Sequence, residues 1–210
     1  MNTEKDDFQP LDEIYKGSFF RRRDRLKWRV PIVCNAVISA TELSPGARIM
    51  DVGCAIGDYV DGFYERGYKA RGIEGSRCAE PFVVPRVKEK ITFGYDLRFS
   101  LPYIEESDVC LCLEVAEHIE EIYADTLVSN LCYLSNVVIV SAAPPGQKGH
   151  HHVNCKNKLY WAEKFQGKKY YRNYKKEEIW RQALGAFIRR KEIACYYHNT
   201  MIFERRITDG

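Results

Sequence analysis

Short apolar runs alternate with amphipathic segments along most of this chain. The apolar runs have the length and near-continuous hydrophobicity of buried strands, and they fall at 48–52, 69–73, 91–94, 108–113 and 136–141. Other segments place their apolar residues at helical spacing, at 59–66, 116–134 and 174–186. Such alternation of strands and helices predicts a mostly parallel sheet covered by helices on both faces.

The flanks of this pattern differ from its centre. Residues 11–40 are expected to be helical, and a short helix is expected at 156–165 after the long loop "APPGQKGHHHVN". Residues 189–199 and 200–206 are rich in aromatic and branched residues, so we expect a closing antiparallel pair there. No repeat or linker interrupts the chain. We therefore expect a single domain, with a helical lid over 1–44, a core over 45–145 and a final part over 146–210.

The composition is that of a soluble globular protein. Of 210 residues, 45% are hydrophobic and 29% charged, and no apolar run is long enough to cross a bilayer. The polar start predicts no signal peptide. None of the eight cysteines has CxxC spacing, which favours free thiols in a reducing, cytoplasmic compartment. A net charge of +3 is too small to indicate nucleic-acid binding by itself.

Suitable polar groups follow three of the expected strands. In parallel sheets, ligands bind beyond the carboxyl ends of the strands. The first strand leads into "DVGCAIGDY", where Gly53 and Gly57 permit a tight turn close to a ligand. Glu74 follows the second strand and can accept both hydroxyls of a ribose. Asp96 follows the third and can accept from an exocyclic amine, although Asp51 and Asp96 could instead serve as a cap and a turn-former.

Four motifs in order resemble class I (Rossmann-like) S-adenosylmethionine-dependent methyltransferases: "IMDVGCAIGDY", "GIEGS", "YDLR" and "SDVCLCLEVAEHI". The resemblance implies an α/β fold with a seven-stranded, mostly parallel sheet, a C-terminal antiparallel hairpin and S-adenosylmethionine as cofactor. Residues 45–145 would bind it. The implied cofactor-binding residues are Asp51, Gly53, Cys54, Gly57, Glu74, Gly75, Asp96, Leu97 and Glu114. Ala55 departs from the family pattern, which usually has a third glycine there.

The segment "EVAEH" carries the candidate chemistry. Methyl transfer to a hydroxyl needs a general base, a metal ion or both, because an alcohol has a high pKa. Glu114, Glu117 and His118 would share one face of a helix that begins early. With His150 from the neighbouring loop they would form a site for Mg²⁺ or Mn²⁺. The pattern resembles the metal site of small-RNA 3′-terminal 2′-O-methyltransferases. A metal-free acid–base role for His118, His150 or His152, or a purely structural role, stays open.

Three consecutive histidines at 150–152 cannot all reach one ion, because neighbouring residues of an extended loop point to opposite sides. At most His150 and His152 share a face. We therefore place these two, with Glu117 and His118, among the candidate catalytic residues.

The segments on either side of the core give indications about the molecule that accepts the methyl group. "GHHHVNCKNKLYWAEKF" resembles small methyltransferases associated with carbohydrate assembly, which implies that Asn154 holds hydroxyls and that Tyr160 or Trp161 stacks on a sugar. The alternative places Trp161 in the core and Asn157 at a helix cap. The basic run "FFRRRDRLKWR" would meet phosphates or lie on a solvated helix face.

The sequence thus predicts an S-adenosylmethionine-dependent O-methyltransferase that acts on a sugar or glycan hydroxyl, such as that of a deoxyhexose, with or without a divalent metal. The alternatives are RNA ribose 2′-O-methylation and a non-catalytic, cofactor-binding partner subunit. The small net charge and the lack of an added RNA-binding domain argue against nucleic acid. The oligomeric state stays open.

Overall fold

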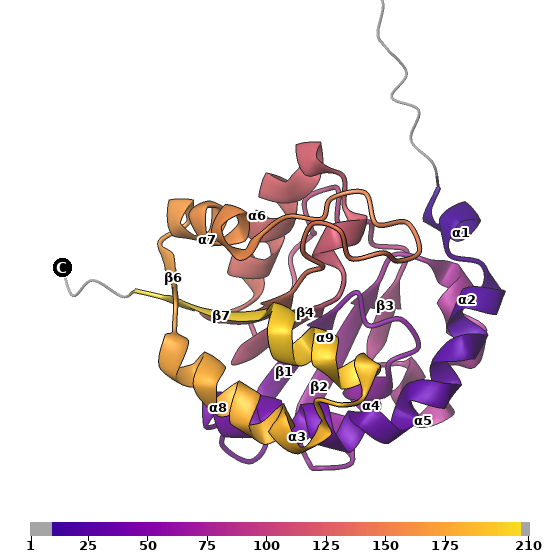
Figure 1. The fold of residues 1–210 in the computed structure, drawn as a ribbon. Helices are drawn as coiled ribbons and strands as arrows, with labels where there is room; N and C mark the ends of the chain where they lie inside the picture. The colour runs from indigo at the N-terminus through magenta and orange to yellow at the C-terminus, as the bar shows by residue number, and fades with distance from the viewer. Residues whose placement is uncertain (1–9, 207–210) are drawn as a thin grey trace, which may run out of the picture.

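A computed structural model describes residues 10–206 and contains one seven-stranded sheet in the order β3-β2-β1-β4-β5-β7-β6 (Figure 1). Strands β1 to β5 are parallel, and β7 is antiparallel to both of its neighbours. The strands are β1 (Arg48–Val52), β2 (Lys69–Glu74), β3 (Ile91–Phe93), β4 (Val109–Leu113), β5 (Val137–Ser141), β6 (Tyr170–Arg172) and β7 (Thr200–Arg205). This confirms the predicted α/β fold with its mostly parallel sheet.

Helices cover both faces of the sheet. The α-helices are α1 (Leu11–Ile14), α2 (Gly17–Arg21), α3 (Val30–Thr41), α4 (Asp58–Tyr64), α5 (Pro85–Lys88), α6 (Ala124–Leu134), α7 (Lys158–Gly167), α8 (Tyr174–Leu184) and α9 (Lys191–Asn199). The 3₁₀ helices are η1 (Arg22–Arg29), η2 (Arg77–Phe82), η3 (Ala116–His118), η4 (Glu121–Tyr123) and η5 (Gly185–Phe187). Among residues 10–206, no helix combines the length and the apolar character needed to span a membrane.

Two hydrophobic cores lie on opposite faces of the sheet. Successive side chains of a strand point to opposite faces, so β4 sends Leu111 into one core and Cys110 and Cys112 into the other. The first core joins the sheet to α3, α4, α8 and α9, and the second joins it to α6 and α7 (Figure 1). Burial on both faces explains why the central strands read as continuous apolar runs.

Three local predictions were wrong. Residues 191–199 form α9 and not a strand, so β7 pairs with β5 and with the unforeseen strand β6. The segment 116–134 is not one helix, because the backbone of Ile119 and Glu120 is non-helical between η3 and η4. Glu117 and His118 therefore stand on a short turn and not on a helix face.

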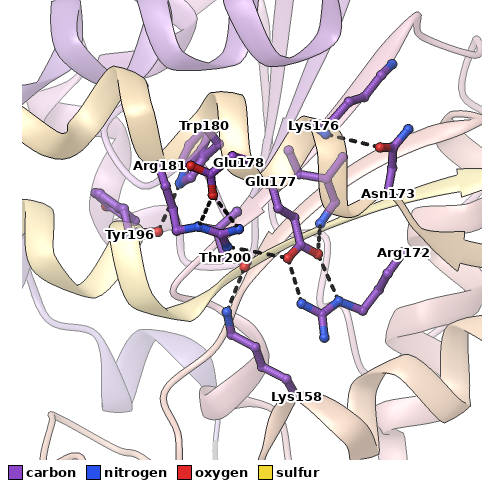
Figure 2. Close-up of polar contacts among 11 residues, drawn as sticks. Lys158, Arg172, Asn173, Lys176, Glu177, Glu178, Trp180, Arg181, Tyr196 and Thr200 are labelled. Carbon is purple, nitrogen blue, oxygen red and sulfur yellow. Dashed lines mark hydrogen bonds and ion pairs between the residues drawn. The ribbon is translucent and has the colours of Figure 1, made fainter.

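A buried ion pair fastens α8 to the antiparallel end of the sheet (Figure 2). Glu177 is 1% exposed and accepts two hydrogen bonds from Arg172 of β6, at 2.8 and 2.6 Å. Its Oε1 atom also accepts from the backbone nitrogen of Ile202 in β7. Asn173 caps α8 by accepting from Lys176 N. One carboxylate thus connects a helix to two strands.

Candidate functional site

A cavity of about 610 Å³ opens at the carboxyl ends of the parallel strands. Its walls come from four parts of the chain: the N-terminal segment 11–23, the ends of β1, β2 and β4, the loop after β5, and α9. A cavity of this size at this edge is where the fold places a ligand site.

The turn after β1 and the end of β2 are joined by a carboxylate. Gly53 has a φ of 75°, and a Cβ there would lie 2.5 Å from Val115. Ala55 donates its backbone N–H to Glu74 Oε2 at 2.8 Å, and Ser76 N donates to Glu74 Oε1 at 2.8 Å. Burial raises the pKa of Glu74, although these backbone donors oppose the shift. Gly53, Ala55, Glu74, Gly75 and Leu97 all line the cavity.

Other predicted cofactor residues lie behind this wall. Gly57 adopts a φ of 76° at the N-cap of α4, and a Cβ there would meet Ile91 at 2.4 Å, so it serves close packing. Cys54 packs with its sulfur against Gly72. Asp51 is buried with Oδ2 unpartnered, and burial raises its pKa to about 7. Asp96 forms an ion pair with the buried Arg98 at 2.8 Å. None of these four predicted residues lines the cavity.

On the other side of the cavity, Glu117, His118 and His152 come together. One potential ligand atom from each lies within 4.8 Å of the others, and His152 Nε2 is 3.9 Å from Glu117 Oε1. Glu117 is 0% exposed, yet neither carboxylate oxygen has a hydrogen-bond partner. A buried carboxylate without partners is costly unless a ligand, a proton or an ion satisfies it.

Both imidazoles of this group are held by backbone carbonyls. His118 Nδ1 lies 3.1 Å from His151 O, and His152 Nδ1 lies 3.0 Å from Gln147 O. A carbonyl only accepts, so each Nδ1 carries the proton and each neutral ring keeps a lone pair on Nε2. Gly149 leaves room for the His152 ring, since a Cβ there would come within 2.0 Å of Nε2.

The charges at this group are tuned by burial. Burial and the nearby charge of Glu114 raise the pKa of Glu117 to about 8. Burial and the neighbouring His152 lower the pKa of His118 to about 4. Two imidazoles that each offer an Nε2 lone pair, beside a buried carboxylate without a hydrogen-bond partner, suit a divalent cation. The donor set therefore fits a metal ion.

The metal set predicted from sequence needs a correction. His150 takes no part in the group, because its Nε2 lies 3.0 Å from Ile14 O of the N-terminal segment. Glu114 is also outside the group, although both residues line the cavity. His152 takes the place assigned to His150. The alternation argument failed because His151 has a φ of 53°, which turns the loop instead of extending it.

Glu114 belongs to a second polar cluster that sequence reasoning missed. Its backbone has a φ of 55° directly after β4. Asn199 at the end of α9 lies 3.3 Å from Glu114 Oε1 and 3.1 Å from Gln147 Oε1, and Gln147 Nε2 lies 3.4 Å from Glu114 Oε2. The cluster lines the cavity beside His152. The signal for Asn199 was present in the three-residue spacing of Ile193, Tyr196 and Asn199, all buried on one face of α9.

The N-terminal segment closes the cavity from outside. Tyr15 packs edge-on against His118 and His150 with ring centroids 5.8 Å apart in each case, and its buried hydroxyl has no partner. Burial raises the pKa of Tyr15 far above its ordinary value. Arg23 also lines the cavity, and its positive charge acts on Asp51 and Glu74. No motif marks Tyr15 in the sequence, whereas Arg23 belongs to the basic run at 19–29.

The predicted acceptor residues do not line this cavity. Trp161 is 1% exposed within the core, so the prediction that it stacks on a sugar is wrong. Tyr160 lies by a separate shallow hollow, against the ammonium groups of Lys156 and Lys164. Asn154 is 2% exposed with both side-chain polar atoms unpartnered, while its backbone nitrogen donates to Glu117 O at 3.0 Å. Asn154 thus braces the turn that carries Glu117.

No protein-family model and no curated protein matches the sequence. Solved structures match by fold. Magnesium protoporphyrin IX methyltransferase from Synechocystis PCC 6803, with bound S-adenosylhomocysteine, is 16% identical with a TM-score of 0.60, over 94% of this chain and 93% of that chain. The Burkholderia thailandensis 1,6-didemethyltoxoflavin-N1-methyltransferase was solved with bound 1,6-didemethyltoxoflavin and S-adenosylhomocysteine. It is 13% identical with a TM-score of 0.61, over 98% of this chain and 94% of that chain.

The cyclase SpnF is also similar, at 15% identity and a TM-score of 0.58, over 85% of this chain and 82% of that chain. At these identities the similarity establishes the class I methyltransferase fold. A fold by itself does not determine the reaction, so the chemistry has to be argued from the cavity.

Proposed function

We propose that this protein is an S-adenosylmethionine-dependent O-methyltransferase that acts on a sugar hydroxyl, assisted by a divalent metal. The observation that carries the proposal is the single cavity in which Glu74 and the Gly53 turn face the group formed by Glu117, His118 and His152. A cofactor-sized site and a group able to bind a metal or remove a proton thus share one cavity.

The cofactor half of the cavity supports S-adenosylmethionine. Glu74 stands at the end of β2 with both oxygens fixed by backbone donors, an orientation suited to two ribose hydroxyls. Arg23 supplies a positive charge near the Gly53 turn that suits the carboxylate of the methionine part. When bound, the cofactor supplies an activated methyl group, and the protein has to position the acceptor in line with it.

The metal half would hold the ion through Glu117, His118 and His152. Two imidazoles and one carboxylate favour Mn²⁺, Fe²⁺ or Zn²⁺ over Mg²⁺, which prefers oxygen ligands. The backbone carbonyls behind both rings fix their tautomers, as second-shell groups do in metalloproteins. Such an ion lowers the pKa of a coordinated hydroxyl. Without it, the Nε2 lone pairs of His118 and His152 are left to take the acceptor proton.

A sugar fits the second polar cluster. Glu114, Gln147 and Asn199 present one carboxylate and two amides to the cavity, a mixture of acceptors and donors that matches neighbouring hydroxyls. Their mutual contacts are long, at 3.1 to 3.4 Å, so a hydroxyl can replace them without leaving a group unpaired. This cluster adjoins His152, which places a bound sugar beside the metal group.

The test combines binding and transfer. Calorimetry should detect S-adenosylhomocysteine binding, and labelled S-adenosylmethionine should transfer its methyl group to saccharide or sugar-nucleotide acceptors after addition of Mn²⁺. Treatment with EDTA should abolish transfer and leave cofactor binding intact. Absence of cofactor binding would refute the proposal as a whole. Transfer only to RNA would refute the sugar acceptor, and transfer that resists EDTA would refute the metal.

A further inference from the structure

Two lysines at the mouth of the cavity have no acidic partner. Lys148 precedes the histidine loop and Lys191 begins α9, and both are exposed and line the cavity. Among residues 10–206, neither forms an ion pair, whereas Lys156 pairs with Glu121 and Lys164 pairs with Asp125. These two charges are therefore available to something outside the folded chain.

The cofactor does not account for these charges. Its anionic carboxylate is matched by Arg23, which acts on Asp51 and Glu74 beside β1 and β2. Lys148 and Lys191 belong instead to the loop after β5 and to α9, the two parts that carry Gln147 and Asn199. They are thus attached to the acceptor side of the cavity.

Lys191 and the polar cluster lie at opposite ends of α9. The Asn199–Gln147 contact of 3.1 Å holds the loop against the inner end of α9. Lys191 lies eight residues earlier on the same helix, roughly 12 Å along its axis at 1.5 Å per residue. A molecule whose hydroxyls reach Asn199 therefore extends past Lys191 as it leaves the cavity. Arg189 and Arg190 extend the positive charge outward, and Arg190 stacks on Trp28 at 5.2 Å.

The acids nearby do not cancel this charge. Glu74 and Glu117 are buried and Glu114 is half-buried, so these carboxylates lie deeper in the cavity than the two exposed lysines. Glu192 is the acidic neighbour at the mouth, and it forms no ion pair with either lysine. At the mouth, the two exposed lysines therefore outnumber the one half-buried carboxylate, that of Glu192. A focused local charge of this kind selects anionic ligands.

We infer that the acceptor is a phosphorylated sugar, with its hydroxyls at Glu114, Gln147 and Asn199 and its phosphate group between Lys148 and Lys191. This inference rests on the proposed function, because it names the substrate class of the same site. The phosphate can be a monoester or the diphosphate of a nucleotide sugar, which share this chemistry. Lysine ammonium groups bind such phosphates as point charges.

The test uses inorganic phosphate and inorganic pyrophosphate as probes on the full chain saturated with S-adenosylhomocysteine. We expect the Kd of the preferred probe to rise about tenfold in Lys148→Gln and in Lys191→Gln, as loss of a charge-assisted contact predicts. Lys69→Gln is the matched control, because Lys69 is exposed at the opposite end of β2 and should leave the Kd unchanged. Tighter binding of phosphate would indicate a phosphate monoester as the acceptor, and tighter binding of pyrophosphate would indicate a diphosphate.

A second measurement compares acceptors. Methyl transfer to a sugar 1-phosphate or nucleotide sugar should exceed transfer to the uncharged methyl glycoside, and the advantage should disappear in the Lys148→Gln, Lys191→Gln double variant. Equal phosphate binding in all variants, or equal transfer to the uncharged glycoside, would overturn the inference. Either result leaves cofactor binding and transfer measurable, so failure here is distinct from failure of the proposed function.

Discussion

His118 and His152 lie with ring centroids 4.9 Å apart and ring planes at 83°. They come from different elements, one from η3 and the other from the loop after β5, and each is held at Nδ1 by a backbone carbonyl. Glu117 completes the group, and neither of its carboxylate oxygens has a hydrogen-bond partner. Such preorganisation by the backbone leaves little freedom to lose when a ligand binds.

The first prediction concerns this group. We expect the protein to bind one Mn²⁺ or Zn²⁺, and Glu117→Gln or His152→Asn to weaken that binding at least tenfold, because each substitution removes one of three ligands. Calorimetric titration of the purified protein with the metal ion measures its Kd. His150→Asn is the control from the same loop and should bind as the wild type does. Equal losses in all three variants would indicate general damage to the loop instead.

Tyr15→Phe separates stability from function. The hydroxyl is buried without a partner, so its removal should leave the melting temperature unchanged or slightly higher. Tyr15 also lines the cavity, where its hydroxyl can donate to a bound molecule, so we expect kcat/KM to fall about tenfold, equivalent to one hydrogen bond of roughly 1.4 kcal/mol. Tyr64→Phe, at an exposed ring, should change neither quantity. An unchanged kcat/KM in Tyr15→Phe would show that the Tyr15 hydroxyl does not donate to the bound molecule.

Ala55→Gly should stabilise the protein. Ala55 has a φ of 52°, a left-handed conformation that costs a residue with a Cβ about 1 kcal/mol or more. Glycine removes this cost but adds freedom to the unfolded chain, so the expected net gain is about 0.5 kcal/mol. Denaturant unfolding measures it. The opposite sign is expected for Ala36→Gly within α3, where glycine should cost at least about 1 kcal/mol. A loss of stability in Ala55→Gly would contradict the strained turn.

Asp51 should make stability depend on pH. Its pKa in the folded protein is raised from 3.8 to about 7, so the folded state holds a proton that the unfolded state has lost. The contribution of Asp51 to the free energy of unfolding should therefore fall as pH rises from about 4 to 7, by at most roughly 4 kcal/mol at about 1.4 kcal/mol per pKa unit. Asp51→Asn should flatten this dependence in urea titrations at several pH values. Equal slopes for wild type and Asp51→Asn over this range would contradict the raised pKa.

Glu177→Gln tests the ion pair that joins α8 to the sheet. The substitution leaves Arg172, whose side chain is 17% exposed, without its carboxylate, so we expect a loss of about 3 kcal/mol in unfolding free energy. Glu178→Gln changes the neighbouring acid, which is 56% exposed and pairs with Arg181 (Figure 2), and should cost less than about 1 kcal/mol. Similar losses for both variants would mean that the buried pair contributes little.

The sequence predicts the parallel core well because its strands are buried on both faces and read as continuous apolar runs. The end of the sheet is harder to predict. Strand β6 has only three residues, and α9 carries tyrosines and Ile193 that also suit a strand. Within the site, Glu74, Glu117 and His118 follow strands and can be found by position. His152 depends on the backbone turn at His151, and Tyr15 and Asn199 reach the cavity through packing of distant segments, which no local pattern encodes.

The strand order has a consequence for synthesis of the chain. Strand β7 follows β6 in sequence but lies between β5 and β6 in the sheet. A nascent chain that has emerged from the ribosome only as far as α8 therefore exposes the open edge of β5, and β6 has nothing to pair with. Asn199 immediately precedes β7, so insertion of this last strand also completes the polar cluster around Glu114. The polar cluster and the sheet are thus completed in the same late step, after translation of residue 205.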